Sequence, residues 1–335
     1  MNTLKKTIIH PPRLLAISFL LAILIGAGLL SLPVASRSGH ISFINALFTS
    51  TSAICVTGLT VVEIATYFSL FGQIVIICLI QLGGLGIMTF SSFILLTAGR
   101  SVTLTGKMVV EGSFRPSVIS DFRSLLRDVF AFTFGLEALG TILLLLRFKG
   151  HLAPGQAIFS SVFHAISAFC NAGFSLFSDN LMSYRSDLAI NLIIMFLIIA
   201  GGLGFFVLQE IKMAVKNLLK KDRTKFSLHT KLVGLITASI IIFGALLVFL
   251  IENGRGFSSL PLKDRWLASF FQVVSARTAG FNTIDLNILS VASILLLMLV
   301  MFIGASPGST GGGVKTTTFG LIFAFLKSKI QGYEI

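Results

Sequence analysis

Long apolar runs alternate with shorter, more polar ones along this chain. A helix needs about 20 apolar residues to cross the hydrocarbon core of a bilayer. Six runs approach or exceed that length, at residues 14–32, 70–98, 129–146, 188–208, 232–251 and from Leu289 onward. Within each successive pair lies a shorter segment, at residues 41–55, 156–169 and 266–277. The pattern predicts a crossing helix, a re-entrant helix with a loop, and a returning helix, three times over.

Each re-entrant segment leads into a loop of related sequence, namely TSAICVTGLT, SAFCNAGFS and SARTAGFNT. In each loop a glycine precedes a large apolar residue, and the glycines lie about 110 residues apart, a spacing typical of a repeated membrane module. The loop positions are Val56, Thr57, Gly58 and Leu59, then Asn171, Ala172, Gly173 and Phe174, then Thr278, Ala279, Gly280 and Phe281.

Glycine also marks the returning helices. Two GGLG tetrads, residues 83–86 and 201–204, lie inside the first two, where we interpret them as helix-packing sites. The third returning helix is interrupted by residues 304–315, which cannot hold a helix and must sit in a water-filled cavity. This segment contains Gly304, Ala305, Ser306, Pro307, Gly308, Ser309, Thr310, Gly311, Gly312, Gly313, Val314 and Lys315. Lys315 either sets an electrostatic barrier there or reaches the inner membrane surface.

Composition fixes the class of protein. Of the 335 residues, 55% are hydrophobic and only 12% are charged, which indicates an all-α polytopic membrane protein. The net charge of +13 lies in clusters between apolar runs, a pattern that indicates membrane orientation rather than nucleic-acid binding. It places the N-terminus, the links of residues 99–128 and 212–231, and the C-terminal tail in the cytoplasm.

The cysteines, the histidines and the charged residues within the apolar runs are typical of structural positions rather than of metal or catalytic sites. Cys55, Cys78 and Cys170 lie in apolar or repeated segments, and the five histidines show no spacing typical of metal ligands. Glu137 lies in the middle of a crossing helix, where we expect a paired structural carboxylate. Arg277, one residue before the third loop, is either a functional charge beside an ion pathway through the protein or a brace for the loop carbonyls.

The three loops are expected to face one axis. Non-helical backbone at membrane depth is tolerated only where it lines water or is buried in protein. The loop carbonyls would then replace the water around a dehydrated cation, with Gly58, Gly173 and Gly280 allowing the unusual φ angles required. The negative C-terminal ends of the re-entrant helices would point at the same axis. The alternative is that these glycines only pack helices together.

The motifs TSAICVTGLT, HAISAFCNAGF, ARTAGFNT and GASPGSTGGGVKTTT, in this order, resemble the Trk/Ktr/HKT superfamily of potassium transporters, most closely its KtrB branch. The resemblance covers essentially the whole chain. It implies that each loop supplies one side of a four-sided K+ filter, that residues 304–315 form the gating loop, and that Arg277 supports the filter. It also implies a non-enzymatic protein of the bacterial cytoplasmic membrane with no covalent cofactor and no metal beyond K+, with Na+ as a candidate coupling ion.

The resemblance further implies partners and a larger whole. The family's membrane subunit is a homodimer on a cytosolic, nucleotide-binding, KtrA-like ring, surrounded by membrane lipid. We expect repeats at residues 1–98, 129–211 and 232–326, with residues 327–335 starting a link to a fourth repeat, so that the chain is a fragment or a truncated copy. The competing hypotheses are a secondary transporter of another small solute and a non-conducting membrane protein.

Overall fold

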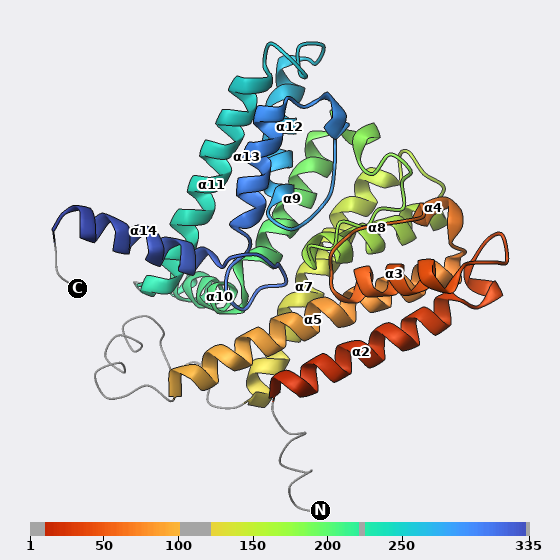
Figure 1. Cartoon of the computed structure of the whole chain (residues 1–335), viewed down its shortest axis with the longest axis horizontal. Helices are drawn as coiled ribbons and strands as arrows, with labels where there is room; N and C mark the ends of the chain where they lie inside the picture. Colours follow the sequence, from red (N-terminus) through yellow and green to blue (C-terminus); the bar gives the residue numbers. More distant parts are fainter. Residues whose placement is uncertain (1–10, 101–121, 221–224, 333–335) are drawn as a thin grey trace, which may run out of the picture.

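The computed structural model describes residues 11–100, 122–220 and 225–332, and these residues are predominantly helical (Figure 1). The predicted links of residues 99–128, 212–231 and 327–335 therefore lie partly outside the described residues. The main helices are α2 (Pro11–Leu30), α3 (Phe43–Ile54), α5 (Leu70–Arg100), α7 (Phe122–Phe148), α8 (Pro154–Phe169), α9 (Leu188–Leu203), α10 (Phe205–Leu219), α11 (Leu228–Glu252), α12 (Leu262–Ala276), α13 (Val291–Phe302) and α14 (Thr316–Ile330). Single turns form α4 (Ile64–Tyr67), η1 (Pro33–Ala35), η3 (Met182–Tyr184) and η4 (Leu286–Ile288). The all-helical fold class is confirmed.

Three units of the same design lie side by side. In each unit the first helix packs on the short one, as α2 on α3, α7 on α8 and α11 on α12. The short helix packs in turn on the returning helix, as α3 on α5, α8 on α9 and α12 on α13. Because α5 contacts α7 and α8, and α9 contacts α12, the units follow one another in chain order, from red through green to blue in Figure 1.

Three helices and one bent pair of helices have the length and composition of membrane spans. Leu70–Ser92, Leu126–Phe148 and Leu228–Glu252 are each long and apolar enough to cross a bilayer, and the bent pair α9 and α10 passes the same test together. Large apolar side chains such as Ile25, Phe243 and Leu250 remain exposed. An outward apolar surface of this kind is what lipid contact requires, so the chain is a multi-pass membrane protein.

Local sequence sets several helix starts. Hydroxyl or carboxylate caps accept a backbone N–H at the first turn of α3, α9, α11 and α13, from Ser42, Asp187, Ser227 and Ser290 respectively. Pro154 occupies the first turn of α8, where its missing N–H costs no hydrogen bond. The three short helices that were predicted to be re-entrant begin near the predicted residues, at Phe43, Pro154 and Leu262.

The prediction of one continuous helix over residues 188–208 is wrong. α9 ends at Leu203, Gly204 adopts a φ of 88°, and α10 leaves at an angle of 108°. In contrast, the first GGLG tetrad lies inside the unbroken α5. Packing does explain Gly83 and Gly201, since an added Cβ would lie 2.0 Å from the carbonyl oxygen of Ile54 and 1.8 Å from that of Phe169. The second tetrad thus packs against the end of α8 and also marks the break between α9 and α10.

Candidate ion-coordination site

The three loops share one unusual backbone conformation. Each holds two left-handed residues separated by one residue that is not left-handed. The pairs are Val56 (φ 54°) with Gly58 (75°), Asn171 (59°) with Gly173 (70°), and Thr278 (72°) with Gly280 (84°). An alternation of left-handed residues with others can turn successive carbonyl oxygens toward one side of a chain, which is the arrangement that a carbonyl-lined ion site needs. Residues other than glycine rarely adopt positive φ. The recurrence of this conformation in all three loops therefore indicates a shared structural requirement.

The structure brings the three loops together in chain order. A Cβ added to Gly58 would lie 2.3 Å from the carbonyl oxygen of Ala172, and one added to Gly173 would lie 2.4 Å from that of Ala279. Gly280 in turn lies against the Cα of Gly173, 3.6 Å from the position of an added Cβ. The glycines are therefore needed for close approach between loops as well as for their φ angles.

The short helices end directly at the loops. Backbone hydrogen bonds continue the last turn into each loop, from the N–H of Thr57 to the carbonyl of Ser52 at 2.9 Å and from that of Ala172 to that of Ser167 at 2.8 Å. The N–H of Gly280 donates to the carbonyl of Ser275 at 3.2 Å. The partial negative charges at the C-terminal ends of α3, α8 and α12 consequently lie beside the loops, where they favour a cation.

Sequence reasoning missed the serines that open the three motifs. The hydroxyl of Ser167 donates to the carbonyl of Phe174 at 2.8 Å, and that of Ser275 to the carbonyl of Phe281 at 2.5 Å. In the first loop, Ser52 accepts a hydrogen bond from Thr57, at 2.9 Å between the hydroxyl oxygens. These bonds fix each loop on its own short helix, and the recurrence of serine in all three motifs was the signal available.

The α13–α14 loop, residues 303–315, lies against the second and third of these loops. The side-chain amide of Asn171 donates to the hydroxyl oxygen of Thr310 at 2.9 Å, and that hydroxyl is 3.1 Å from the carbonyl of Phe169. A Cβ added to Gly311 would lie 2.6 Å from the hydroxyl oxygen of Thr278. Ser306, Ser309 and Thr310 are buried, so the loop is a packed element rather than a surface excursion.

The two cations near this loop hold its backbone. Lys315 donates to the carbonyl of Gly311 at 2.8 Å, within the loop itself. Arg277 is buried, and its guanidinium lies 3.5 Å from the carbonyl oxygen of Gly304 and 3.4 Å from the hydroxyl of Thr237. In the described part of the chain, Arg277 therefore contacts the start of the α13–α14 loop and α11, where a contact to the filter-loop carbonyls was expected.

Glu137 lies close to the second loop despite its distance in sequence. Its side chain is buried, accepts a hydrogen bond from the amide of Gln81 at 3.2 Å, and lies 3.9 Å from the sulfur of Cys170, which immediately precedes Asn171. The carboxylate thus joins α7 to α5 and to the end of α8. Among the described residues no group of three or more His, Cys, Asp or Glu side chains could hold a metal ion.

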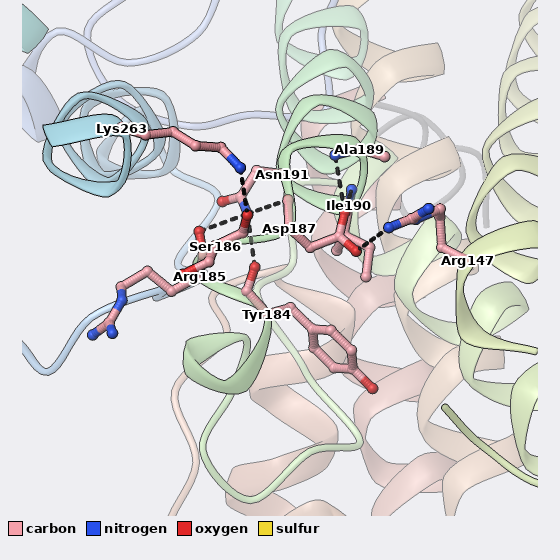
Figure 2. A network of polar contacts seen from close by, with 9 residues as sticks. All are labelled: Arg147, Tyr184, Arg185, Ser186, Asp187, Ala189, Ile190, Asn191 and Lys263. Atoms are coloured by element: carbon pink, nitrogen blue, oxygen red, sulfur yellow. Dashed lines mark hydrogen bonds and ion pairs between the residues drawn. The ribbon is translucent and has the colours of Figure 1, made fainter. Parts of the chain in front are cut away.

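A second polar network, formed around the loop between α8 and α9, joins the second and third units (Figure 2). Lys263 of α12 donates to the carbonyl of Ser186 at 3.1 Å, and the amide of Asn191 donates to the carbonyl of Tyr184 at 2.9 Å. The loop between α8 and α9 is thereby tied both to α12 and to the first turns of α9.

Asp187 is the charged centre of this network. One carboxylate oxygen accepts from the N–H groups of Ala189 and Ile190, at 2.9 and 3.0 Å, and the other lies 2.6 Å from the guanidinium of Arg147 (Figure 2). Burial by itself raises the pKa of Asp187, but the hydrogen bonds and the charge of Arg147 outweigh it, so this pKa lies below its ordinary value of 3.8.

Backbone loops that meet at the ends of short helices inside a membrane protein are the arrangement that ion-transport proteins use to hold a dehydrated ion. Residues 17–334 match the TrkH family model, described as cation transport protein, and the chain belongs to this family. It is 43% identical to the Ktr system potassium uptake protein B of Bacillus subtilis (strain 168), over 96% of this chain and 71% of that protein. It is 36% identical to the potassium/sodium uptake protein NtpJ of Enterococcus hirae, over 99% of this chain and 73% of that protein.

A solved structure shows the same fold. The potassium transporter TrkH from Vibrio parahaemolyticus superposes with a TM-score of 0.68 over 95% of this chain, at 22% identity. The chain spans 64% of the length of that transporter. The likeness supports the polytopic helical architecture derived above.

Proposed function

We propose that this chain is the pore-forming subunit of a potassium uptake system. The observation that carries the proposal is the meeting of three loops with one backbone conformation, at Gly58, Gly173 and Gly280. A bare K+ ion needs several oxygen ligands to replace its water shell, and inward-facing peptide carbonyls supply them without a fixed charge. The names of the B. subtilis and E. hirae relatives, both potassium uptake proteins, support K+ as the ion.

The finer assignments follow the same reasoning. The filter would comprise residues 56–59, 171–174 and 278–281, and the α13–α14 loop, packed against Asn171 and Thr278, would be the gate. Arg277 and Lys315 would hold the gate backbone. Repeats at residues 1–98, 129–211 and 232–326 would carry these parts, with an N-terminus in the bacterial cytoplasm. The word sodium in the name of NtpJ supports Na+ as a coupling ion.

The proposed partners are a second copy of this chain and a cytosolic subunit. The Ktr name of the B. subtilis relative describes a system, which supports at least one further subunit. A homodimer resting on a cytosolic nucleotide-binding ring would place the ring beneath the basic links, whose positive charge suits an acidic or nucleotide-bearing surface.

A matched pair of glycine variants tests the function. Gly173→Ser places a side chain at a φ of 70° and forces its Cβ to within 2.4 Å of a backbone carbonyl, so the second loop must move. Strain of about 1–3 kcal/mol in the coordinating geometry corresponds to a loss of roughly five- to 150-fold in potassium uptake. Uptake is measured in a bacterial strain that lacks its own potassium uptake systems.

Gly155→Ala is the control, because this glycine lies in the first turn of α8 with open space around it, and its uptake should equal that of the unmodified protein. Equal uptake by the Gly173→Ser variant would reject the filter and favour a solute carrier or a scaffold.

A further inference from the structure

The break between α9 and α10 is a hydrogen-bond exchange with the α13–α14 loop. In a continuous helix the carbonyl of Gly201 accepts from the N–H of residue 205. Here the N–H of Phe205 donates to the carbonyl of Gly308 at 2.9 Å, and the carbonyl of Gly201 accepts from the N–H of Thr310 at 3.2 Å. The carbonyl of Gly202 likewise accepts from the N–H of Ser306, at 2.9 Å. The loop has replaced the partners that the helix would supply.

In the first unit, none of the described loops is seated on the same tetrad. Residues 83–86 repeat the sequence GGLG, and α5 runs through them unbroken. The tetrad sequence is therefore compatible with a continuous helix. What distinguishes the second tetrad is the loop that occupies its carbonyls, helped by Ser91 of α5, whose hydroxyl accepts from the N–H of Gly308 at 3.0 Å.

We propose that the α9–α10 break is the dock of the α13–α14 loop, and that the loop leaves only as α9 and α10 join into one helix. The physical reason is that peptide groups at membrane depth must be paired in both states. When the loop leaves, the N–H of Phe205 donates to the carbonyl of Gly201 in the hydrogen bond of a continuous helix, so neither group is left without a partner. The role of this switch in opening a pore rests on the proposed function; the docking itself does not.

Gly204 is the positioning residue of the dock. Its φ of 88° and ψ of 154° lie in a region that is essentially restricted to glycine. A Cβ at this position would also lie 2.4 Å from the carbonyl oxygen of Pro307. Gly204→Ala therefore disfavours the docked loop on two counts, while alanine favours the continuous helix.

A pair of cysteines tests the dock directly. A Cβ added to Gly202 would lie 3.8 Å from the Cβ of Ala305, which matches the separation in a disulfide. The Gly202→Cys/Ala305→Cys protein is oxidised in membranes, the cross-link is identified by mass spectrometry, and potassium uptake is measured before and after reduction. The single variants Gly202→Cys and Ala305→Cys are the controls, since all arms contain Cys55, Cys78 and Cys170.

The expected result is a disulfide that lowers uptake by about tenfold or more, with recovery on reduction, because the loop is then confined to one state. Failure of the disulfide to form, or a disulfide with undiminished uptake, would overturn the proposal. If the unmodified protein takes up no potassium, the proposed function fails, while the cross-linking rates below still decide whether the loop docks.

The second measurement compares two glycines of the two tetrads. Introduced into the cysteine pair, Gly204→Ala should slow cross-linking by up to about tenfold, since a conformational cost of about 1.4 kcal/mol shifts the equilibrium between docked and released loop by that factor. Gly86→Ala is the control, because an added Cβ there meets only the ring of Phe19, at 3.3 Å, within an unbroken helix. Equal rates in the two backgrounds would refute a positioning role for Gly204.

Discussion

At the scale of single residues, the left-handed conformations carry the most information. Among the described residues, four that are not glycine have a positive φ. Three of them, Val56, Asn171 and Thr278, occupy the same position in the three loops. Asparagine tolerates this region, but branched valine and threonine are strained by about 1–3 kcal/mol. Such strain persists only where the surroundings enforce it. The hydrogen bonds to Ser52, Ser167 and Ser275 supply that enforcement.

Asp187 provides a pH test at the same scale. Its pKa is lower in the folded chain than in the unfolded one, so its charge stabilises the fold above the unfolded pKa. This contribution disappears as pH falls through the lower, folded pKa. Asp187→Asn keeps a residue able to cap α9 but removes the charge that pairs with Arg147. The variant should unfold at a lower temperature than the unmodified protein at pH 7, and the difference should shrink below about pH 4.

The measurement is thermal unfolding of both proteins in detergent across this pH range. Lys149→Gln serves as the control, since it removes a neighbouring charge with no ion pair in the described structure. A gap between the Asp187→Asn and unmodified proteins that is unchanged at low pH would show that the charge of Asp187 does not cause it.

Which residues lie close together was predictable from sequence only where motifs repeat. Gly58, Gly173 and Gly280 stood out because related motifs recur at similar spacing. Arg277 has no counterpart in the other two motifs, and its neighbours Gly304 and Thr237 lie 27 and 40 residues away. A contact of that kind depends on how α11, α12 and the α13–α14 loop pack, which no local pattern encodes.

At the scale of elements, the returning helices are fitted to the short helices by glycine. A methyl group on Gly83 or Gly201 would overlap the carbonyl of the last residue of α3 or α8. The helices would have to separate, which would displace the end of each short helix and the loop that follows. Gly83→Ala and Gly201→Ala should therefore each lower the unfolding temperature and potassium uptake, with a cost of about 1–3 kcal/mol typical of overpacking.

Gly135→Ala in α7 is the matched control, because an added Cβ there meets no atom within 4 Å. Alanine is the better helix former by about 1 kcal/mol, so this variant should be as stable as the unmodified protein or more stable. Thermal unfolding in detergent and uptake in cells are compared for all three. If Gly83→Ala or Gly201→Ala behaves like Gly135→Ala, the close packing of returning and short helices is not required.

The elements themselves were largely predictable, whereas the break in α9 was not. Apolar run length located the first and the returning helix of each unit, and the shorter, more polar segments located α3, α8 and α12. The two GGLG tetrads are identical in sequence, yet one is helical and the other ends a helix at Leu203. The difference arises from the α13–α14 loop, about 100 residues further along the chain, so local propensity had no means of separating them.

At the scale of the whole molecule, the units share their cores. Phe169, Cys170 and Ala172 of the second unit pack in one hydrophobic cluster with Val56 and Ile80 of the first. A second cluster joins α8 and α9 to Phe271, Ala279 and Phe281 of the third unit. The loops are therefore held by contacts between units, and an ion bound among them would stabilise all three units together.

This arrangement predicts that potassium stabilises the folded protein. A ligand that binds only the native state adds RT ln(1 + [L]/Kd), about 2.7 kcal/mol at a concentration of 100 Kd. K+ should raise the unfolding temperature more than equal concentrations of Na+ or Li+, because the smaller ions are poorly matched to the same carbonyls. The fluorescence of Trp266, the single tryptophan, reports the unfolding transition. Its ring stacks on that of Phe249, joining α12 to α11, with 3.9 Å between the ring centroids.

The Gly173→Ser variant separates this effect from general salt stabilisation. With the second loop displaced, its unfolding temperature should respond alike to K+, Na+ and Li+, whereas the Gly155→Ala protein should keep the preference for K+. A preference for K+ that survives Gly173→Ser would place the stabilising ion away from the three loops. Equal stabilisation of the unmodified protein by all three ions would leave the loops without a selective site, because a carbonyl cage that favours one ion must bind it more tightly.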